Sequence, residues 1–357
     1  MPVRPGFVEG LAFHRLGLAP LPLLDVFGAF SFRVLVAGLR LGVFDSCTEP
    51  CDLRRLATDL NVDADSLAAL LKALEAIGYL EERSEGWVNT SATNRWLVDR
   101  EGSGVRSGVE YWARLLEGPL AHPDQNLTNP RDETLYEWLA DNQERADVFQ
   151  EWMVEVFGLA GSEIIKKIPR GSVGDSLLDV GGGHGWYSIE LCRENPNLKA
   201  TILDHPAATR TTSQRIQEAG MGDRISIVNG DYTSYETSKP FDTVLMFNIL
   251  HGHKTGELDQ LLTRSIRWLS DQGHLLIVEQ FPDTPGFAKT TTTLLALAYD
   301  QLLDGAGHDY TTVKDSLHNA GYTTINRKRM RIARGTSLNQ ARPYRHHALV
   351  GTTPPPS

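Results

Sequence analysis

The chain has 357 residues, of which 22% are charged and 41% are apolar, and its formal net charge is −10. At about 100–200 residues per domain, this length predicts two domains, or one large domain with an appendage. An acidic chain is a poor candidate for a nucleic-acid binder, because such a protein needs a basic surface for the phosphate backbone. An Arg or a Gly interrupts each long apolar run well before about 18 residues, so we expect no membrane span.

The three cysteines, Cys47, Cys51 and Cys192, are an odd and sparse set. Such a set, with an N-terminus that lacks the layout of a secretory signal, predicts reduced thiols in a cytoplasmic protein. Cys47 and Cys51 are close enough in sequence to be bridged or to share a metal. Because no second pair of ligands stands nearby, we expect neither.

Residues 31–100 have the layout of a winged helix-turn-helix. Two helical segments, 31–45 and 51–60, precede a third at 64–80, and a polar, hairpin-like stretch follows at 81–97. Short helices followed by a β-wing are typical of DNA-binding modules. The layout alone is therefore compatible with a ligand-sensing transcription factor.

The third helix argues against DNA binding. Residues 64–77 hold one basic residue, Lys72, beside Asp65 and Glu75, and are otherwise almost wholly apolar. A helix that reads a DNA groove needs exposed Arg, Lys, Asn or Gln side chains. We therefore predict a packing or dimerisation module, a homodimer and no nucleic-acid partner. An apolar helix at 7–40 is expected to add to that interface or to the core.

After about residue 170, β-branched apolar runs alternate with helical segments, which is typical of a parallel α/β sheet. The predicted strands are 176–180, 199–204, 224–229, 241–250 and 274–280, and the helices between them are 185–194, 207–219 and 255–269. Ligands of such sheets sit beyond the carboxyl ends of the strands. An acid or a His stands at each of these ends: Asp179, Asp204, Asp231, His251 and Glu279. We expect an active site at this edge.

A glycine run follows the first of these strands, with glycines at 181, 182, 183 and 185. The dinucleotide pattern GxGxxG fits poorly, because its third position falls on Trp186 or Ser188. The run instead fits DxGxGxG, the glycine signature of S-adenosylmethionine-dependent methyltransferases, and Asp204 stands where an acid can take both ribose hydroxyls. The alternative is a glycine-rich turn without a ligand.

Five segments occur in the order and spacing of a known family: LLDVGGGHG, TILDHPAA, RISIVNGDY, LMFNILHGH with an acidic helix after it, and LLIVEQFPD. From about residue 30 to 350 the chain resembles the small-molecule O-methyltransferases with an N-terminal winged-helix dimerisation domain. The resemblance implies a Rossmann-like, mostly parallel sheet of seven strands. The expected domains are a mainly helical winged-helix domain at 1–105, a helical linker that contributes to the substrate pocket at 106–170, and a catalytic domain at 171–357.

The resemblance also implies S-adenosylmethionine as cofactor, with S-adenosylhomocysteine as its product. The residues assigned to the cofactor are Asp179, Gly181, Gly183, Gly185, Asp204, Asp231, Tyr232 and Phe247. Among them the three glycines line the methionine end, Asp204 binds the ribose, and Asp231 with Tyr232 contacts the adenine.

His251 matches the catalytic base of the family, and Glu279 and Asp309 match the two carboxylates that flank and orient it. A histidine is suited to take the proton of a phenol near neutral pH, and neighbouring carboxylates fix its tautomer. The substrate pocket is expected from Trp112, Phe149, Trp152, Met153, Asn248, Leu295 and Tyr299. These residues suggest an apolar, planar acceptor, a hydroxylated aromatic or polyketide-like metabolite, although the same residues would make an ordinary core.

The chain departs from the family at one motif. Most relatives have His-Asp-Trp where this sequence has His251-Gly252-His253. The departure gives weight to an alternative enzyme that keeps the fold and cofactor but hydroxylates, decarboxylates, catalyses a pericyclic step, or methylates carbon or nitrogen. His251 and His253 with Glu257 superficially suggest a metal site, but the layout predicts none.

Overall fold

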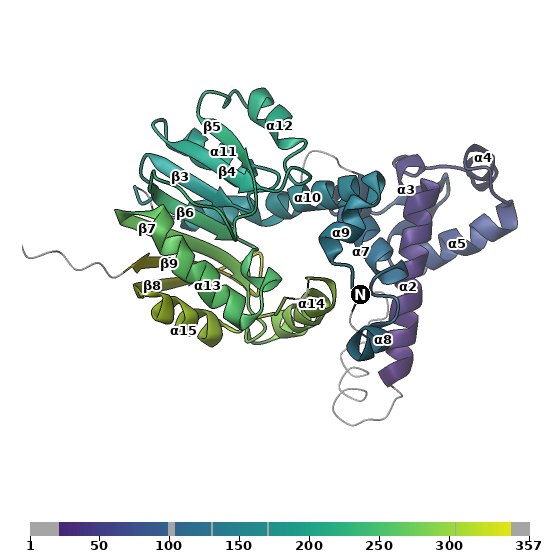
Figure 1. The fold of residues 1–357 in the computed structure, drawn as a ribbon. Coiled ribbons are helices and arrows are strands. Elements are labelled where there is room, and N and C mark those ends of the chain that lie inside the picture. Colours follow the sequence, from purple (N-terminus) through teal and green to yellow (C-terminus); the bar gives the residue numbers. More distant parts are fainter. Residues whose placement is uncertain (1–20, 99–103, 130, 170, 304, 344–357) are drawn as a thin grey trace, which may run out of the picture. The chain divides into compact units, whose positions relative to one another are not determined.

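The computed structural model describes residues 21–98, 104–129, 131–169, 171–303 and 305–343. The chain divides into two compact units (Figure 1). One unit comprises Met1–Ala121 with Glu144–Gly158, and the other comprises His122–Gln143 with Leu159–Ser357. The helix α10, Gln143–Lys167, runs from one unit into the other.

The first unit has the expected succession of helices and a hairpin. Its elements are α2 (Leu21–Leu41), α3 (Val43–Ser46), α4 (Leu53–Asp59), α5 (Ala64–Ala76), β1 (Leu80–Arg83), β2 (Gly86–Asn89), α6 (Ser91–Thr93), a π-helical turn (Asn94–Val98) and α7 (Arg106–Glu117). Aspartates begin two of these helices: Asp52 accepts backbone hydrogen bonds at the start of α4, and Asp63 does so at the start of α5. Both are the N-cap residues that such helices prefer.

The third helix of this unit faces inward. Leu67, Leu71 and Leu74 of α5 lie one helical turn apart and are almost fully buried. They pack in one cluster with Val34 and Leu39 of α2. The apolar side of α5 is therefore core, as its sequence indicated.

The helix α2 also has an apolar side that this unit leaves exposed. Leu23, Val26, Phe27 and Phe30 are between 52% and 65% exposed. By length and composition alone, Pro22–Leu41 could cross a membrane, although core helices and signal sequences pass the same test. This differs from the expectation that no apolar stretch reaches that length: Arg33 and Arg40 are too few to interrupt it.

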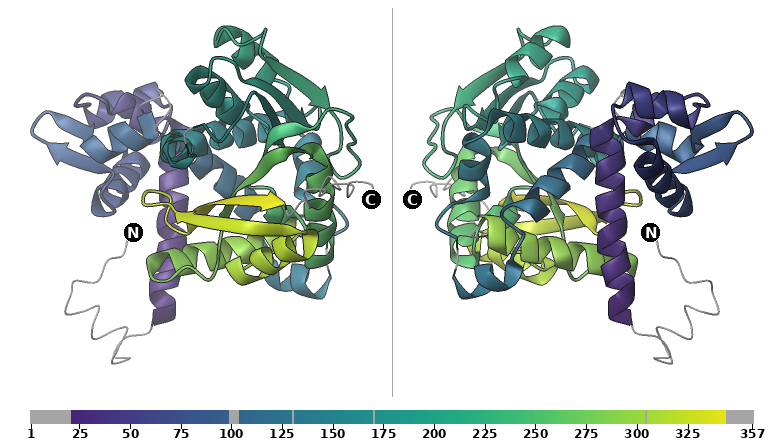
Figure 2. Two further views of the ribbon diagram at one scale, coloured as in Figure 1. Left: turned by 90° about the vertical axis from the view of Figure 1, so that its left-hand side faces the viewer. Right: turned by 90° about the vertical axis from the view of Figure 1, so that its right-hand side faces the viewer.

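The second unit is built on the expected sheet of seven strands. The strands are β3 (Ser176–Val180), β4 (Lys199–Asp204), β5 (Ile225–Asn229), β6 (Phe241–Phe247), β7 (Leu269–Gln280), β8 (Tyr322–Arg329) and β9 (Thr336–Pro343). Their order is β5-β4-β3-β6-β7-β9-β8. Neighbours from β5 to β7 pair in parallel, and the β8–β9 hairpin, yellow in Figure 2, adds antiparallel strands at one side. The Rossmann-like fold is confirmed.

Helices make up the rest of this unit. They are α8 (Pro123–Thr128), α9 (Leu135–Ala140), the end of α10, α11 (Trp186–Glu194), α12 (Thr212–Glu218), α13 (Thr255–Ser265), α14 (Phe287–Leu303) and α15 (Tyr310–Ala320), with short 3-10 turns at Leu250–Gly252 and Ile266–Trp268. Leu258 and Leu262 of α13 and Leu317 of α15 share one buried cluster with Val244 and Ile277 of the central strands. This core fixes the strands whose carboxyl ends form the site.

Strand β6 ends three residues earlier than the sequence predicted. Asn248 has a positive φ of 56°, and its backbone N–H still donates to Val278 O at 2.8 Å. Asparagine tolerates this left-handed conformation better than most residues. The chain therefore turns at Asn248 into the 3-10 turn Leu250–Gly252, which holds His251.

Candidate active site

The glycine run forms a tight loop between β3 and α11. Gly181, Gly183 and Gly185 all have positive φ, at 64°, 43° and 77°. This region is costly for residues with a Cβ, so the spacing of the glycines follows from the backbone path. A Cβ on Gly183 would have no neighbour closer than Asp204 Oδ2 at 3.7 Å. That side of the loop is open enough for a ligand to approach the backbone.

Asp179 lies in β3, directly before this loop, and links the strand to α11. Its side chain is only 2% exposed, and its Oδ2 accepts a hydrogen bond from Ser188 Oγ at 2.7 Å. Burial raises the pKa of Asp179 to about 7, and the nearby charge of Asp204 adds to the shift while the Ser188 bond opposes it. The carboxyl group therefore faces α11, and its assignment to the cofactor remains a prediction.

Asp204 stands at the end of β4 with both carboxylate oxygens anchored. Oδ2 accepts from Gly183 N at 2.9 Å, and Oδ1 accepts from His205 N at 2.7 Å. A carboxylate oxygen can accept more than one hydrogen bond, so each retains capacity for a ligand hydroxyl. Burial raises the pKa of Asp204, and the two backbone bonds oppose that shift. The loop glycine and the acid thus form one preorganised unit.

Asp231 and Tyr232 follow β5 on the same edge. The exposed carboxylate of Asp231 accepts from Thr233 N at 2.7 Å and from Thr233 Oγ1 at 2.6 Å, which fixes the local turn. The half-buried Tyr232 shares a hydrogen bond of 3.1 Å between its hydroxyl and His253 Nε2. Phe247, at the end of β6, packs edge-to-face on Tyr187 with ring centroids 4.8 Å apart.

His251 and Glu279 meet at the ends of β6 and β7. His251 Nδ1 lies 3.0 Å from Glu279 Oε1. Glu279 is 2% exposed, and it also accepts backbone hydrogen bonds from Leu250 N, His251 N and Gln280 N. Burial alone would raise the pKa of Glu279, but the His251 interaction and these bonds outweigh it and lower the pKa. An ionised carboxylate can only accept, so Nδ1 carries a hydrogen, and in the neutral imidazole this tautomer leaves the lone pair on Nε2.

The loop and the histidine are neighbours because β3 and β6 are adjacent parallel strands. A Cβ built on Gly181 would lie only 2.1 Å from Ile249 Cδ1. Ile249 directly precedes the turn that holds His251. The structure therefore brings the predicted cofactor loop and the predicted base together at one edge.

Asp309 does not join this group. It is exposed and begins α15, where its Oδ1 accepts from Thr312 N at 2.7 Å. Hydrogen bonds from Thr312 are the largest cause that lowers the pKa of Asp309. Of the two carboxylates that the resemblance implied beside the base, only Glu279 contacts His251. The described geometry of Asp309 is that of a helix N-cap, and its role beside the base stays a prediction.

The predicted pocket residues fall in both units. Trp112, Phe149, Trp152 and Met153 lie in the first unit, so their role remains a prediction. Asn248, Leu295 and Tyr299 lie in the second unit and are all partly exposed. The Tyr299 ring stacks on the His251 ring, with centroids 3.9 Å apart and planes 14° apart.

The surroundings of His253 could not be predicted from the sequence. It is 8% exposed, its backbone oxygen lies 2.8 Å from His308 Nε2, and its Nδ1 is 3.9 Å from Glu257 Oε2. Burial is the main cause that lowers its pKa. His253 therefore links the turn after β6 to Tyr232 and to the segment before α15, which only the folded arrangement reveals.

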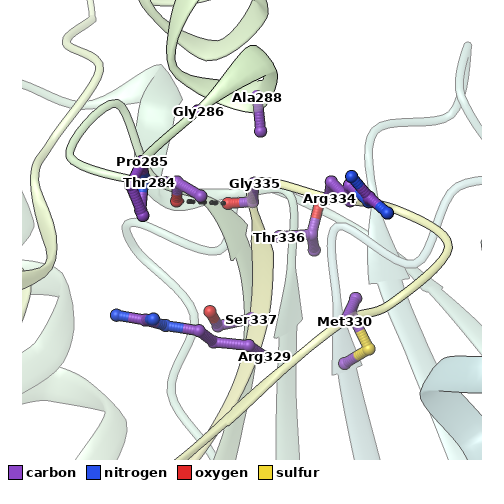
Figure 3. A pocket seen from close by; sticks show the side chains of 10 residues that line it. All are labelled: Thr284, Pro285, Gly286, Ala288, Arg329, Met330, Arg334, Gly335, Thr336 and Ser337. Atoms are coloured by element: carbon purple, nitrogen blue, oxygen red, sulfur yellow. Dashed lines mark hydrogen bonds between the residues drawn. The ribbon is translucent and has the colours of Figure 1, made fainter.

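A cavity elsewhere in this unit contains none of the residues predicted for the site. It lies between the start of α14 and the β8–β9 hairpin and is lined by Thr284, Pro285, Gly286, Ala288, Arg329, Met330, Arg334, Gly335, Thr336 and Ser337. Figure 3 shows Arg329 and Arg334 extending in different directions, while Thr284 Oγ1 bonds Gly335 O at 3.4 Å. The two cations therefore do not converge on one ligand position.

Proteins of known activity resemble this chain over most of its length. A 3-hydroxy-5-methyl-1-naphthoate 3-O-methyltransferase of Streptomyces sahachiroi is 26% identical over 317 residues, covering 84% of this chain and 88% of the relative. An L-tyrosine C(3)-methyltransferase of Streptomyces lavendulae is 25% identical and covers 86% of this chain and 88% of its own length. The crystal structure of human N-acetylserotonin methyltransferase with S-adenosylmethionine has a TM-score of 0.77 at 21% identity, covering 90% and 97% of the two chains.

The family model decides the relationship. A model described as an O-methyltransferase domain matches residues 126–323, more than half of the chain. That range contains the glycine loop, Asp204, His251 and Glu279. The protein belongs to this family of O-methyltransferases.

Proposed function

We propose that this protein transfers the methyl group of S-adenosylmethionine to a hydroxyl of a small aromatic or polyketide-like acceptor, with His251 as general base. The pairing of His251 with the buried, ionised Glu279 beside the glycine loop carries this proposal. The named activities of the bacterial relatives, on a naphthoate and on tyrosine, support an aromatic acceptor.

The residues at the edge fit the cofactor. The open face at Gly183 admits a ligand against the backbone, and the anchored carboxylate of Asp204 can accept the two ribose hydroxyls. Tyr232 and Phe247 supply aromatic surface for the adenine side. When bound, the cofactor supplies an electrophilic methyl on a positively charged sulfur.

The chain's own chemistry is a proton transfer. Nε2 of His251 would take the acceptor's O–H proton as the oxygen attacks the methyl group, which S-adenosylmethionine held by the glycine loop and Asp204 would supply while keeping the carbon–sulfur electron pair on sulfur. Glu279 holds the tautomer that presents Nε2 and stabilises the imidazolium that forms. The remainder of the rate comes from holding oxygen, carbon and sulfur in line.

Methylation of a ring carbon is the second candidate, and the tyrosine C(3)-methyltransferase relative favours it. A phenolate shares its negative charge with the ortho carbon, so the same base would serve either outcome. The product separates the two: O-methylation yields a methoxy group and removes the acidic phenol, whereas C-methylation yields an aryl methyl group and keeps the phenol.

The N-terminal unit is proposed to form a homodimer. The exposed apolar side of α2 supports this, because such a surface marks an association site in a chain that works in water. A cytoplasmic location without nucleic-acid or membrane partners is part of the same proposal. Sedimentation of the purified protein would give twice the chain mass, and Phe27→Glu with Phe30→Glu would return the monomer.

The first experiment is a calorimetric titration with S-adenosylmethionine and with S-adenosylhomocysteine. We expect micromolar binding of both, and a loss of at least about tenfold in Asp204→Ala, with the exposed Asp223→Ala as a matched control that binds normally. Absence of binding by the folded wild-type protein would refute the cofactor site. An unchanged dissociation constant in Asp204→Ala would refute the ribose role of that residue.

The second experiment is a panel of phenols and hydroxyquinones with products read by mass. We expect a gain of one methyl group, and loss of turnover in His251→Ala with cofactor affinity nearly unchanged. Methyl transfer that survives in His251→Ala would contradict the general-base role. A product without an added methyl group would point to the alternative chemistries on the same fold.

A further inference from the structure

The ring of Tyr299 lies flat against the imidazole of His251. The centroid distance of 3.9 Å and the interplanar angle of 14° describe a stacked pair. Aromatic pairs more commonly have centroids about 4.5–7 Å apart and offset or edge-on rings. Tyr299 comes from α14, far along the chain from the turn that holds His251, so the tertiary fold makes this contact.

The hydrogen bond to Glu279 fixes only one edge of the imidazole. It holds Nδ1 at 3.0 Å from the carboxylate, but a single hydrogen bond tolerates some tilting of the ring plane. A flat contact over the face restricts this tilting. The two contacts together fix where Nε2 points, and near-attack geometry depends on that direction.

A second carboxylate was expected to share this task, but Asp309 caps α15 instead. Within the described part of the chain, the hydrogen bond and the ring contact of the His251 side chain are those with Glu279 and Tyr299. The ring of Tyr299 therefore contacts His251 where the resemblance implied the carboxylate of Asp309.

The segment after α14 also holds the backbone of this histidine. His251 O accepts a hydrogen bond from Ala306 N at 3.1 Å. A Cβ built on Gly305 would lie 2.1 Å from the same oxygen, so this approach requires a glycine. Helix α14 and its C-terminal continuation thus contact both the ring and the backbone of His251.

We propose that Tyr299 is a positioning residue, which holds the plane of the His251 imidazole by stacking and thereby aims Nε2 at the acceptor hydroxyl. The inference rests on the proposed function, in which His251 is the base. The electron-rich face of the phenol ring also attracts a cation, so it favours the imidazolium that forms on proton transfer. Burial and the charge of Glu279 raise the pKa of Tyr299, which keeps its ring a neutral phenol.

The test is an NMR spectrum of the protein labelled at histidine Cε1, with the His251 signal assigned by its loss in His251→Gln. Ring current displaces a nucleus held over an aromatic face, so we expect the wild-type signal well upfield of those of the exposed His122 and His205. Tyr299→Phe keeps the face and should leave the signal unchanged. Tyr299→Leu removes the face and should abolish the displacement.

Two controls separate this outcome from a folding defect. Leu294→Ala alters an exposed residue of the same helix and should not move the His251 signal. Each variant must also bind S-adenosylhomocysteine as the wild type does, and Tyr299→Met replaces Tyr299→Leu if the latter fails to bind. A wild-type signal at the position of exposed histidines, or a Leu or Met variant with the wild-type signal, overturns the proposal.

Kinetics give an independent readout once an acceptor is known. A positioning residue predicts that Tyr299→Leu lowers kcat at least about tenfold with little change in the acceptor KM, and that Tyr299→Phe restores kcat. A rise in KM at constant kcat would instead make Tyr299 a wall of the acceptor pocket and overturn the positioning role. Survival of methyl transfer in His251→Ala would refute the base while leaving the NMR result intact, so the two failures are distinguishable.

Discussion

Two carboxyl groups are equally buried at the edge of the sheet that holds the candidate site, and their environments shift their pKa values in opposite directions. Asp179 under the glycine loop and Glu279 beside His251 are each 2% exposed. Burial raises the pKa of Asp179 to about 7, whereas the pKa of Glu279 is lowered despite its burial. The difference lies in the donors, because Asp179 accepts one hydroxyl bond whereas Glu279 faces three backbone N–H groups and an imidazole.

Burial depth therefore does not decide whether a carboxyl group can serve a base; the number of donors around it does. Beneath the glycine loop a carboxyl group with a raised pKa supports the backbone that we propose meets the cofactor. Beside His251 an ionised carboxylate fixes a tautomer. The same residue chemistry thus supports the loop on one side of the edge and is proposed to orient the base on the other.

Glu279→Ala is the variant for which we expect the largest effect on activity. The change removes the acceptor of Nδ1 and of the surrounding N–H groups, so we expect kcat to fall by about 10²–10⁴-fold. Binding of S-adenosylhomocysteine should change by less than about threefold, because Asp204 and the loop are intact. Turnover would be measured with the acceptor found in the phenol panel, and calorimetry would measure the affinity.

Glu279→Gln separates the effect of the charge of this side chain from the effect of its shape. The amide keeps the volume but must turn an NH₂ group toward neighbouring donors, so it should lose turnover nearly as strongly as Glu279→Ala. The exposed Glu194→Ala is the matched control and should retain full activity. Normal turnover in Glu279→Gln would show that shape, not charge, is what His251 needs.

Asp179→Asn tests the raised pKa of the buried carboxyl group beneath the glycine loop. A group whose pKa is about 4 when unfolded and about 7 when folded takes up a proton on folding between those values, so its contribution to stability is full below pH 4 and is lost as pH rises to 7. The variant lacks this titration. As pH rises from 4 to 7, the wild type should therefore lose stability relative to the variant. The free energy of unfolding of the variant minus that of the wild type should increase by up to about 1.4 kcal/mol per pH unit.

Urea unfolding of both proteins at several pH values between 5 and 7.5 measures this difference. Asp223→Asn, an exposed change of the same kind, controls for net charge. Parallel stability curves for wild type and Asp179→Asn would mean that Asp179 is ionised in the folded protein. The contrast with Glu279 would then disappear.

The glycine loop and Asp204, proposed to hold the cofactor, could be predicted from the sequence more readily than the surroundings of His251. A strand, three glycines at fixed spacing and an acid at the end of the next strand are local signals, because each reports a backbone path within a few residues. The strands β3 and β4 accordingly match their predicted bounds. Strand ends that depend on one left-handed residue, such as Asn248 after β6, are not visible in an apolar run.

The base side combines segments that are distant in the chain. His251 and Glu279 were predicted because each ends a strand, but the partners of the base beyond Glu279 depend on how loops pack. Asp309 had the right residue type near the right position and became a helix cap. Tyr299 was expected to line a pocket, and its flat contact with His251 follows from the placement of α14, which no local pattern encodes.

A matched pair of glycine variants tests the point where the two sides touch. Gly183→Ala and Gly181→Ala both force a Cβ into a left-handed conformation, which costs about 1 kcal/mol. Only the Cβ at Gly181 would also collide with Ile249, at 2.1 Å. We expect Gly181→Ala to lower the free energy of unfolding by about 2 kcal/mol, because the end of the Ile249 side chain must shift, and Gly183→Ala by about 1 kcal/mol. Ile249→Ala should relieve the Gly181→Ala variant, and equal losses for the two glycines would refute the contact.

The smallest expected effect concerns the carboxylate that lies apart from both sides. Asp309→Ala removes the N-cap of α15 and should lower the free energy of unfolding by about 1 kcal/mol, whereas Asp309→Asn keeps a capping oxygen and should lower it by less. Turnover should stay within about twofold of the wild type in both variants, because the Asp309 carboxylate serves Thr312 N and not the base. The pKa of Asp309 is lowered, so its capping contribution is present above the unfolded value and is lost as pH falls through the folded one. Urea unfolding and the methyl-transfer assay decide the point: a loss of turnover in Asp309→Ala like that of Glu279→Ala would restore the second carboxylate to the base and remove the need for Tyr299 to position it.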